Sequence, residues 1–396
     1  MKKKALLISI SLVVVIVIVA GALYFFTGGS NSSGSKGGLK SKIDYSLIPV
    51  ESGHKWGYIN HKGTFVINPQ FSDAYPFVKG MAAVMVGNKW GYINKSGKIV
   101  INPQFNEEAI GFKEGLANVE SGSKFGYINE KGRFVINPQF RSASNFINGM
   151  AAVMVGNKWG YINKSGKIII NPQFNSVSDF KNGLAVVESG SKYGYINEKG
   201  NFVINPQFRK AGAFKDGFAA VESGNKWGYI NKKGKFVINP QFRNEGNFEN
   251  GLAIVKSGNK WGYINEKGRF VINPQFKLAL PFMNNNKIVP VMSGNKWGYI
   301  NKKGIFVINP QFKLASVFRN GLAIAVSGHK FGYINKKGKF VINPQFKLAF
   351  PFKDGLAAVE VGNKWGFINK KGRIVINPQF NKVRYFNNLA NYFLNY

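Results

Sequence analysis

The sequence predicts an all-β repeat protein, because one phrase recurs ten times along its 396 residues. The phrase, KWGYIN followed by FVINPQF, returns about every 34 residues, and such a period is the signature of solenoids, propellers and arrays. With 44% hydrophobic and 15% aromatic residues, the chain is too apolar to be disordered. A single unit of this size cannot offset its own chain entropy, so we expect each unit to bury its faces against its neighbours.

An aromatic residue followed by glycine lies at the start of the motif in every unit. The aromatic varies among Trp, Phe and Tyr, which suits packing against a neighbouring unit, and a platform for stacking sugars is the alternative. The glycine marks either a β-bulge or the close approach of another backbone. The ten predicted packing aromatics are Trp56, Trp90, Phe125, Trp159, Tyr193, Trp227, Trp261, Trp297, Phe331 and Trp365.

The unit that begins at residue 218 shows which strands to expect. Residues 218–222 and 226–230 are rich in β-formers, and a Ser-Gly-Asn turn signal separates them. The sequence NKKG at residues 231–234 is typical of a tight hairpin turn that leads into a third strand at residues 235–238. The Asn-Pro pair at residues 239–240 should end that strand, because proline cannot donate to a ladder. We therefore expect three short antiparallel strands and a connector in each unit.

Both faces of each unit carry apolar side chains, so both have to be covered. Propeller blades usually have four strands and come in about 4–8 copies, which fits poorly with ten units of three. Residues 47–50 already supply the first strand of unit one, and residues 387–396 read as a C-terminal cap. We expect an open superhelical β-array over residues 43–386, with a closed propeller-like ring as the alternative. Pro49 and Pro290 share one slot of the first strand, which should face an unpaired edge.

Residues 1–26 predict a transmembrane signal anchor. Three lysines precede 22 apolar or small residues without a charge, and about 20 such residues span a bilayer as a helix. The lysines should stay in the cytoplasm, which places the repeats on the extracytoplasmic side of the membrane. Cleavage at the small-residue site 20–22 would instead give a secreted protein. The Gly/Ser-rich residues 27–42 are expected to be a flexible linker.

The motif resembles the WG-repeat, or KWG-repeat, proteins of bacteria. The similarity rests on the string GNKWGYINKKGKFVINPQF at residues 224–242, followed by F-x-x-G-L-A, and it covers roughly 340 of the 396 residues. The resemblance implies a β-rich repeat protein that is often exported or tethered to the bacterial cytoplasmic membrane, with a binding or scaffold role. It supplies no catalytic residues.

The chain is strongly basic, with 54 Lys and Arg against 18 Asp and Glu and a formal charge of +36. Such a surface attracts anionic lipid, nucleic acid and acidic cell-wall polymers; a lysine-rich exterior that only maintains solubility is the alternative. Our leading hypothesis is multivalent binding of an anionic envelope polymer or a partner protein. A structural spacer in the envelope is the second hypothesis, and nucleic-acid binding is the third. The candidate polyanion-binding residues are the lysine pairs of four hairpin turns: Lys232, Lys233, Lys302, Lys303, Lys336, Lys337, Lys370 and Lys371.

No constellation of residues predicts catalysis, so we expect no enzyme activity, cofactor, metal site or small-molecule substrate. The chain has no cysteine, and its histidines, His54, His61 and His329, fall at turn positions without metal-ligand spacing. The repeated Asn of the hairpin turn and the Gln of Pro-Gln-Phe are expected to serve structure, with sugar hydroxyls as alternative ligands.

Overall fold

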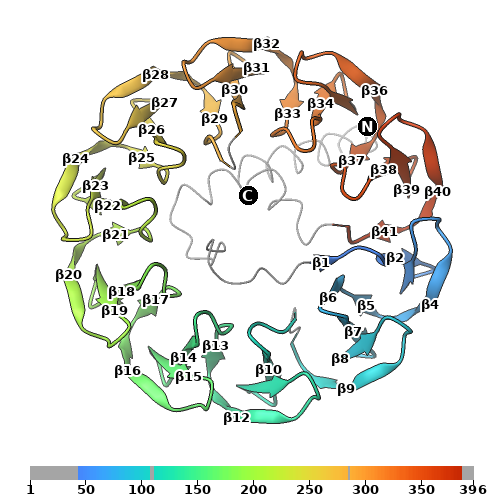
Figure 1. Ribbon diagram of the computed structural model, residues 1–396, viewed down its shortest axis with the longest axis horizontal. Helices are drawn as coiled ribbons and strands as arrows, with labels where there is room; N and C mark the ends of the chain where they lie inside the picture. The colour runs from blue at the N-terminus through green and yellow to red at the C-terminus, as the bar shows by residue number, and fades with distance from the viewer. Residues whose placement is uncertain (1–42, 108–110, 284–285, 386–396) are drawn as a thin grey trace, which may run out of the picture.

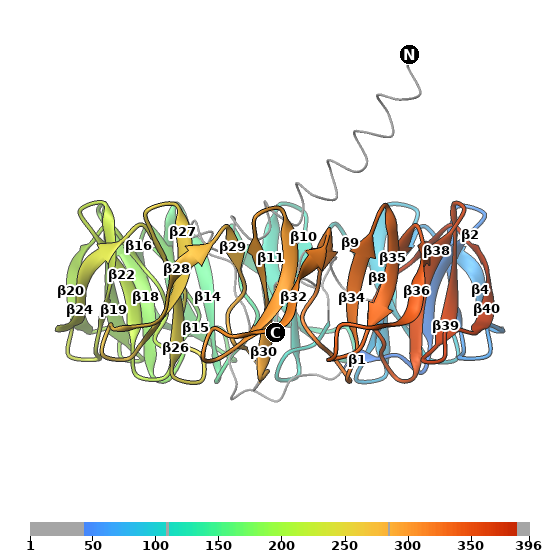
Figure 2. The same ribbon diagram turned by 90° about the horizontal axis from the view of Figure 1, so that it is seen from above.

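A computed structural model describes residues 43–107, 111–283 and 286–385, and these form ten β-sheets arranged as a ring (Figure 1). Each sheet is one blade, and Figure 2 shows that the blades stand side by side at the same height. We number the blades 1–10 by their outer strands, from β4 (Phe65–Phe71) to β40 (Ile374–Phe380).

Three sequence-based expectations fall outside the described residues. They are the membrane anchor at residues 1–26, the linker at residues 27–42 and the cap at residues 387–396. Within the described ranges, no helix is long and apolar enough to cross a membrane.

The two ends of the chain close the ring. β41 (Lys382–Val383), near the C-terminus, pairs with β2 (Ile48–Ser52), near the N-terminus, so that both ends contribute to blade 1. The expectation of an open superhelical array is therefore wrong, and the fold is a ten-bladed β-propeller (Figure 1). Closure has a simple physical reason: an end blade without a neighbour would expose an apolar face, and the shared blade leaves no such end.

Most blades contain four antiparallel strands instead of the three expected, because a two-residue inner strand precedes the other three. The inner strands are β41, β5 (Asp73–Ala74), β13 (Ser142–Ala143), β17 (Ser176–Val177), β21 (Lys210–Ala211), β25 (Asn244–Glu245), β29 (Leu278–Ala279), β33 (Leu314–Ala315) and β37 (Leu348–Ala349). The second strands are β2, β7 (Met81–Val86), β10 (Leu116–Ser121), β14 (Met150–Val155), β18 (Leu184–Ser189), β22 (Ala219–Ser223), β26 (Leu252–Ser257), β30 (Ile288–Ser293), β34 (Ala323–Ser327) and β38 (Leu356–Val361).

The third and outer strands carry the repeated phrase. The third strands are β3 (Lys55–Ile59), β8 (Lys89–Asn94), β11 (Lys124–Asn129), β15 (Lys158–Asn163), β19 (Lys192–Asn197), β23 (Lys226–Ile230), β27 (Lys260–Asn265), β31 (Lys296–Asn301), β35 (Lys330–Ile334) and β39 (Lys364–Asn369). The outer strands are β4, β9 (Ile99–Phe105), β12 (Phe134–Phe140), β16 (Ile168–Phe174), β20 (Phe202–Phe208), β24 (Phe236–Phe242), β28 (Phe270–Phe276), β32 (Phe306–Phe312), β36 (Phe340–Phe346) and β40. Blade 2 also contains β6 (Phe77–Val78), which pairs with β1 (Ile43–Asp44) from the start of the chain.

The outer strand continues through the Asn-Pro pair that was expected to end it. Trp227 pairs with Phe242 and Tyr229 pairs with Ile238, so the outer strand fits extra residues into a bulge that contains the proline. A Cβ on Gly228 would lie 2.5 Å from the Ile238 carbonyl oxygen. Both readings of the glycine therefore hold: a bulge is present in the facing strand, and its backbone approaches too closely for a side chain.

The slot shared by Pro49 and Pro290 lies where the inner strand ends. In the same slot of blade 4, the Ala152 carbonyl accepts a hydrogen bond from the Ser144 amide, while the Ala152 amide donates to the Ser144 hydroxyl. The slot therefore offers the amide no ladder carbonyl, as expected for a position that tolerates proline.

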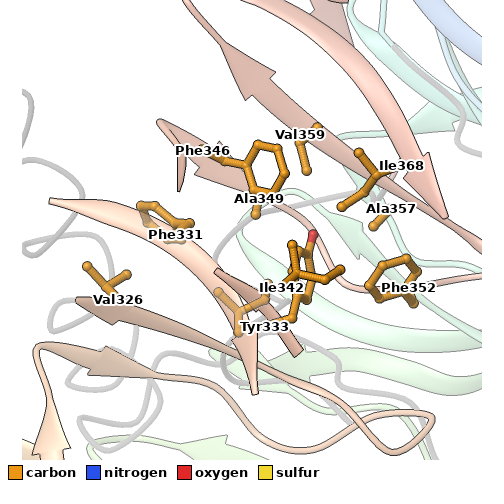
Figure 3. Packing of buried hydrophobic residues seen from close by; sticks show 11 residues of the cluster. Val326, Phe331, Tyr333, Ile342, Phe346, Ala349, Phe352, Ala357, Val359 and Ile368 are labelled. Carbon is orange, nitrogen blue, oxygen red and sulfur yellow. The ribbon is translucent and has the colours of Figure 1, made fainter. Parts of the chain in front are cut away.

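The hydrophobic core consists of ten clusters, one in each interface between adjacent blades. Between blades 9 and 10, Phe331 and Tyr333 of β35 pack in one cluster with Phe352 and Ile368 of the next blade (Figure 3). A tyrosine also bridges these two blades, because the Tyr333 hydroxyl donates to the Phe350 carbonyl at 2.6 Å. The same bond recurs at other interfaces, with donors Tyr58, Tyr127, Tyr161, Tyr195, Tyr229, Tyr263 and Tyr299.

Candidate functional site

The lysine pairs lie in the turns between third and outer strands, which we call the outer hairpin turns. In blade 6, Asn231 starts the turn: its side-chain oxygen accepts hydrogen bonds from the amides of Lys233 and Lys235 at 3.0 and 3.1 Å. The equivalent asparagine does the same in all ten blades. The structural role expected for this asparagine is confirmed, and each turn has a fixed shape.

Each outer hairpin turn is also held by the preceding blade. Gly234 of blade 6 has a φ of +78°, and a Cβ built on it would lie 3.2 Å from Ile204 of blade 5. Glycine therefore serves both the left-handed conformation and the close packing between blades. The lysines beside this glycine therefore extend from a turn that is packed against the preceding blade.

All ten outer hairpin turns lie on one face of the ring, which we call the hairpin face, because the third strands all run in the same direction across the blades. These ten turns, from residues 60–64 to residues 369–373, contain 21 Lys and Arg and three Glu. Their formal charge of +18 is half of the +36 of the whole chain. The cationic charge is thus concentrated at one end of the blades.

The candidate lysines are not evenly distributed around the hairpin face. Three of the outer hairpin turns belong to blades 8, 9 and 10, which are neighbours in the ring (Figure 1). They lie at residues 301–305, 335–339 and 369–373. We call these three turns the cationic arc; they contain eight Lys and Arg and no acidic residue. Lys232 and Lys233 of blade 6 lie apart from the arc, because blade 7 intervenes with Glu266 in its turn. The eight candidate lysines are all exposed.

The first lysine of the outer hairpin turn is engaged differently from blade to blade. In blade 4, Lys164 forms an ion pair of 3.0 Å with Glu114, from the loop that precedes the second strand of blade 3. In blade 2, Lys95 forms an ion pair with Asp44. In the arc, Lys302 donates to the Asn250 carbonyl at 3.2 Å instead.

Within the described part of the chain, no hydrogen bond or ion pair engages the ammonium groups of four further arc residues. They are Lys336, Lys337, Lys370 and Lys371. These groups remain available to an external anion.

The opposite face of the ring has lysines that are balanced by acids. Buried carboxylates on second strands contact lysines of the inner-strand region: Glu51 lies 2.7 Å from Lys382, and Glu360 lies 2.9 Å from Lys347. This face also carries the lysine that starts each third strand, which is exposed in every blade except blade 2. Its charge is therefore spread around the ring and partly neutralised.

The ten motif aromatics lie inside the blades. Six are buried, with the largest exposed fraction at 7%, and the other four are half-buried. Trp227, for example, is 5% exposed and belongs to the cluster between blades 6 and 7. The six buried rings have no open face for a sugar.

Sequence reasoning missed one polar cluster, where the C-terminal strand of blade 1 meets blade 2. Arg384 follows β41 and reaches into blade 2, where it contacts Asp73 and the carbonyl of Ala74. Its guanidinium also lies 4.1 Å from the centre of the Tyr75 ring and 5.0 Å from that of Trp56. The sequence does contain a signal for this last inner strand. KVRY at residues 382–385 begins two residues after Asn-Pro-Gln-Phe, where the inner strands of the other blades also begin.

The histidines lie at turns and near the seam. His61 donates from Nε2 to the Tyr45 carbonyl at 2.8 Å, and His329 accepts from Lys313 at 3.2 Å. Across the described residues, no group of three His, Asp or Glu side chains could hold a metal ion.

A ten-bladed ring built from aromatic-glycine repeats agrees with the family signature that the sequence carries. The signature described as "WG containing repeat" matches ten consecutive segments, and the chain belongs to this family. The matched segments are residues 56–90, 90–125, 125–159, 159–193, 193–227, 227–261, 261–297, 297–330, 331–365 and 365–392. No curated protein matches the chain.

Several solved structures are similar in outline, at low sequence identity. A eukaryotic initiation factor aligns over 85% of this chain and 96% of its own, with 12% identity and a TM-score of 0.49. Hsv2p of Kluyveromyces lactis aligns over 60% of this chain and 95% of its own, with 12% identity and a TM-score of 0.35. PorZ of Porphyromonas gingivalis, a surface component of a type-IX secretion system, aligns over 84% and 53%, with 10% identity and a TM-score of 0.28. Similarity at this level says nothing of what the chain binds.

Proposed function

We propose that the protein binds an anionic polymer of the cell envelope through the cationic arc. The observation that supports this most strongly is the composition of the arc: eight Lys and Arg and no acid in three neighbouring turns. Each turn is fixed by its asparagine and glycine, so the charges are held at a repeated spacing. A polymer with regularly spaced negative groups is the ligand that matches such a surface.

Binding of this kind depends on the number of contacts. A single exposed ion pair contributes about 0–1 kcal/mol and is screened by salt. Three turns on one rigid ring present their lysines together, so a polymer that contacts the first turn meets the others at high effective concentration. Affinity should therefore be low for a short anionic fragment and high for a long chain.

The proposed setting is the extracytoplasmic side of a bacterial membrane, with residues 1–26 as the anchor. Support comes from the lysines and the long apolar run in the sequence. Protease added to intact spheroplasts should then degrade the repeats while a cytoplasmic marker survives. Survival of both would contradict this location, and release of the repeats into the medium would favour a secreted protein.

The two alternatives make different demands on the ring. A spacer needs length, whereas a closed ring does not lengthen in one direction as units are added. This favours the binding hypothesis over the spacer. Nucleic acid offers the same phosphate chemistry as an envelope polymer, so it has to be compared directly.

The test uses full-length protein in an uncharged detergent, with polyglycerol phosphate and double-stranded DNA as probes at matched phosphate concentration. One variant carries Lys→Gln at Lys302, Lys303, Lys336, Lys337, Lys370 and Lys371. The matched control carries six Lys→Gln changes on the opposite face, at Lys192, Lys226, Lys260, Lys296, Lys330 and Lys364. We expect the arc variant to lose at least about tenfold in affinity for polyglycerol phosphate, and the control much less.

Three results would contradict the proposal. Equal losses in the two variants would mean that only total charge matters. No binding of either polymer would make the lysines a solubility feature. Tighter binding of DNA than of polyglycerol phosphate would favour the nucleic-acid alternative.

A further inference from the structure

The outer circumference of the ring is uncharged, in contrast to its two faces. All ten outer strands have the sequence of FVINPQF or a close variant, and none contains a charged residue. In β4 the side chains of Val66, Asn68 and Gln70 are exposed, while Ile67 and Phe71 are buried. The same alternation recurs in every outer strand. We call this surface the rim.

The rim is continuous around the ring. Where an outer strand begins with phenylalanine, that ring packs edge-on against the last phenylalanine of the preceding outer strand, as Phe236 does against Phe208 at 6.1 Å. The same contact crosses the seam between chain ends, where Phe65 packs against Phe380 at 6.0 Å. The outer strands thus follow one another as a band (Figure 1, Figure 2).

The exposed Asn and Gln of the rim are the same in all ten units, whereas exposed residues of the turns are not. The Asn and Gln of Asn-Pro-Gln-Phe occur ten times without exception. By contrast, the second residue of the outer hairpin turn is His61, Glu130 or Lys232 in different units, and the residue after the motif ranges from Ser72 to Arg209. Duplication alone would preserve both sets of positions equally. A constraint acts on the rim that does not act on the turns.

Packing does not account for this constraint, because the rim amides have few internal contacts. The Gln207 side chain approaches the Asn205 carbonyl at 3.4 Å, and the same long contact occurs at Gln70, Gln139 and Gln241. Among the described residues, no hydrogen bond involves the side chain of Asn205 or of its equivalents. These amides therefore keep most of their hydrogen-bonding capacity for an external partner.

We propose that the rim binds an uncharged polysaccharide. Exposed Asn and Gln side chains can donate to and accept from sugar hydroxyls. The half-exposed Val and Phe side chains beside them, such as Val237 and Phe236, match the apolar C–H faces of a pyranose ring. Because the rim is uncharged on a chain with a formal charge of +36, it favours an uncharged ligand. A ligand that repeats along its length explains why every unit keeps the same Asn and Gln side chains.

Two other occupants fit the rim less well. Addition of a β-strand to the free edge is impeded, because a proline lies within each outer strand, as Pro240 does in β24. A globular protein on a convex surface would contact only a few blades and would not require ten identical ones. The site is separate from the cationic arc, and the proposal does not depend on the function proposed for that arc.

The test measures retention of the full-length protein on insoluble uncharged polysaccharides, with chitin, cellulose and curdlan as probes. The salt concentration is about 1 M, where the screening length is roughly 3 Å and the cationic faces contribute little. The rim variant carries Gln→Ala at five consecutive blades: Gln207, Gln241, Gln275, Gln311 and Gln345. The matched control carries five exposed Lys→Ala changes on the hairpin face of the same blades: Lys199, Lys233, Lys267, Lys303 and Lys337.

We expect retention on at least one polysaccharide, a loss of about a hundredfold in avidity for the rim variant, and no change for the control. Circular dichroism verifies that both variants are folded. Absence of retention on all three probes would overturn the proposal, as would equal retention of wild type and rim variant. Self-association that the rim variant abolishes, measured by sedimentation velocity, would assign the rim to a second copy of the chain instead.

Discussion

Arg384, which follows the C-terminal strand of blade 1, lies against Asp73 of blade 2, with its Nη1 atom 3.0 Å from the Asp73 Oδ1 atom. The arginine comes from the end of the described chain and the aspartate from the inner strand of blade 2. The contact therefore ties the C-terminal strand to two blades at once. The next residue holds the other side of blade 1: Phe367 replaces the bridging tyrosine of blade 10, and the Tyr385 hydroxyl instead donates to the Lys353 carbonyl of blade 10 at 2.6 Å.

We expect Arg384→Ala to destabilise the ring by about 2–3 kcal/mol, from the loss of a cation–π contact and hydrogen bonds to a charged group. Denaturant unfolding of full-length protein measures the change. Arg373→Ala, in an exposed hairpin turn, is the control and should be close to neutral. Equal stability of the two variants would show that the cluster does not hold the C-terminal strand against blade 2.

Removal of β41 should open the ring. A chain that ends at Asn381 lacks the strand that pairs with β2, so blade 1 loses its inner strand and the Val383 and Tyr385 side chains that pack against blade 10. A chain that ends at Tyr385 keeps β41 and is the matched control. We expect the shorter chain to be cut by protease within blade 1 much faster than the control. Similar protection of both chains would contradict closure by β41.

The sequence predicted the three longer strands of each blade well, and failed where local signals are weakest. Alternation over five residues is visible in Lys226–Ile230, but a two-residue strand such as Lys210–Ala211 has no periodicity to detect. Closure depended on the equally short Lys382–Val383, so it was missed for the same reason. Pro240 was taken as a strand end because a bulge that accommodates proline depends on the neighbouring strand, which a local pattern does not show.

Gly228→Ala should be strongly destabilising, by more than about 3 kcal/mol, because the new Cβ would lie 2.5 Å from the Ile238 carbonyl oxygen. The neighbouring atoms are backbone and cannot move aside without disrupting the outer strand. Gly212→Ala is the control, since its Cβ would meet its nearest neighbour at an ordinary 3.5 Å. Thermal unfolding distinguishes the two, and a small effect of Gly228→Ala would contradict the close approach.

The ring should lose stability at alkaline pH. Burial raises the pKa of Tyr195 and of Tyr263 well above the ordinary value of 10.0. A group whose pKa is raised in the folded state contributes stability below its unfolded pKa and loses it as the pH rises above that value. We therefore expect the free energy of unfolding to fall steadily above about pH 10.

Tyr263→Phe isolates one tyrosine from this effect. The variant loses the hydrogen bond of 2.8 Å to the Leu280 carbonyl, at a cost of about 1 kcal/mol at neutral pH. It should also lose stability less steeply between pH 10 and 12, because one titrating group is gone. An unchanged slope would show that Tyr263 does not contribute to the alkaline transition.

The candidate site was only partly visible in the sequence. The lysine pairs and the turn asparagine could be identified from spacing alone. Units 8, 9 and 10 are consecutive, so their turns would be neighbours in an open array as well, whereas the packing of each turn against the preceding blade, as Gly234 packs against Ile204, depends on the structure. The contrast between Lys164, engaged by Glu114, and Lys336 also depends on contacts between blades. For Gln70 and its equivalents the sequence favoured a structural role and left sugar hydroxyls as the alternative, because the exposure of Asn68 and Gln70 is set by the outer position of their strand.

The central claim is that the cationic arc is the binding surface, and the salt dependence of binding tests it most directly. For a flexible anionic polymer, the logarithm of the binding constant falls with the logarithm of salt concentration by about 0.7 per phosphate neutralised. The variant with six Lys→Gln changes in the arc should therefore show a slope for polyglycerol phosphate that is shallower by up to about four units. The control with six changes on the opposite face should keep the wild-type slope. If the two variants give the same slope, the arc is not the surface that meets the polymer.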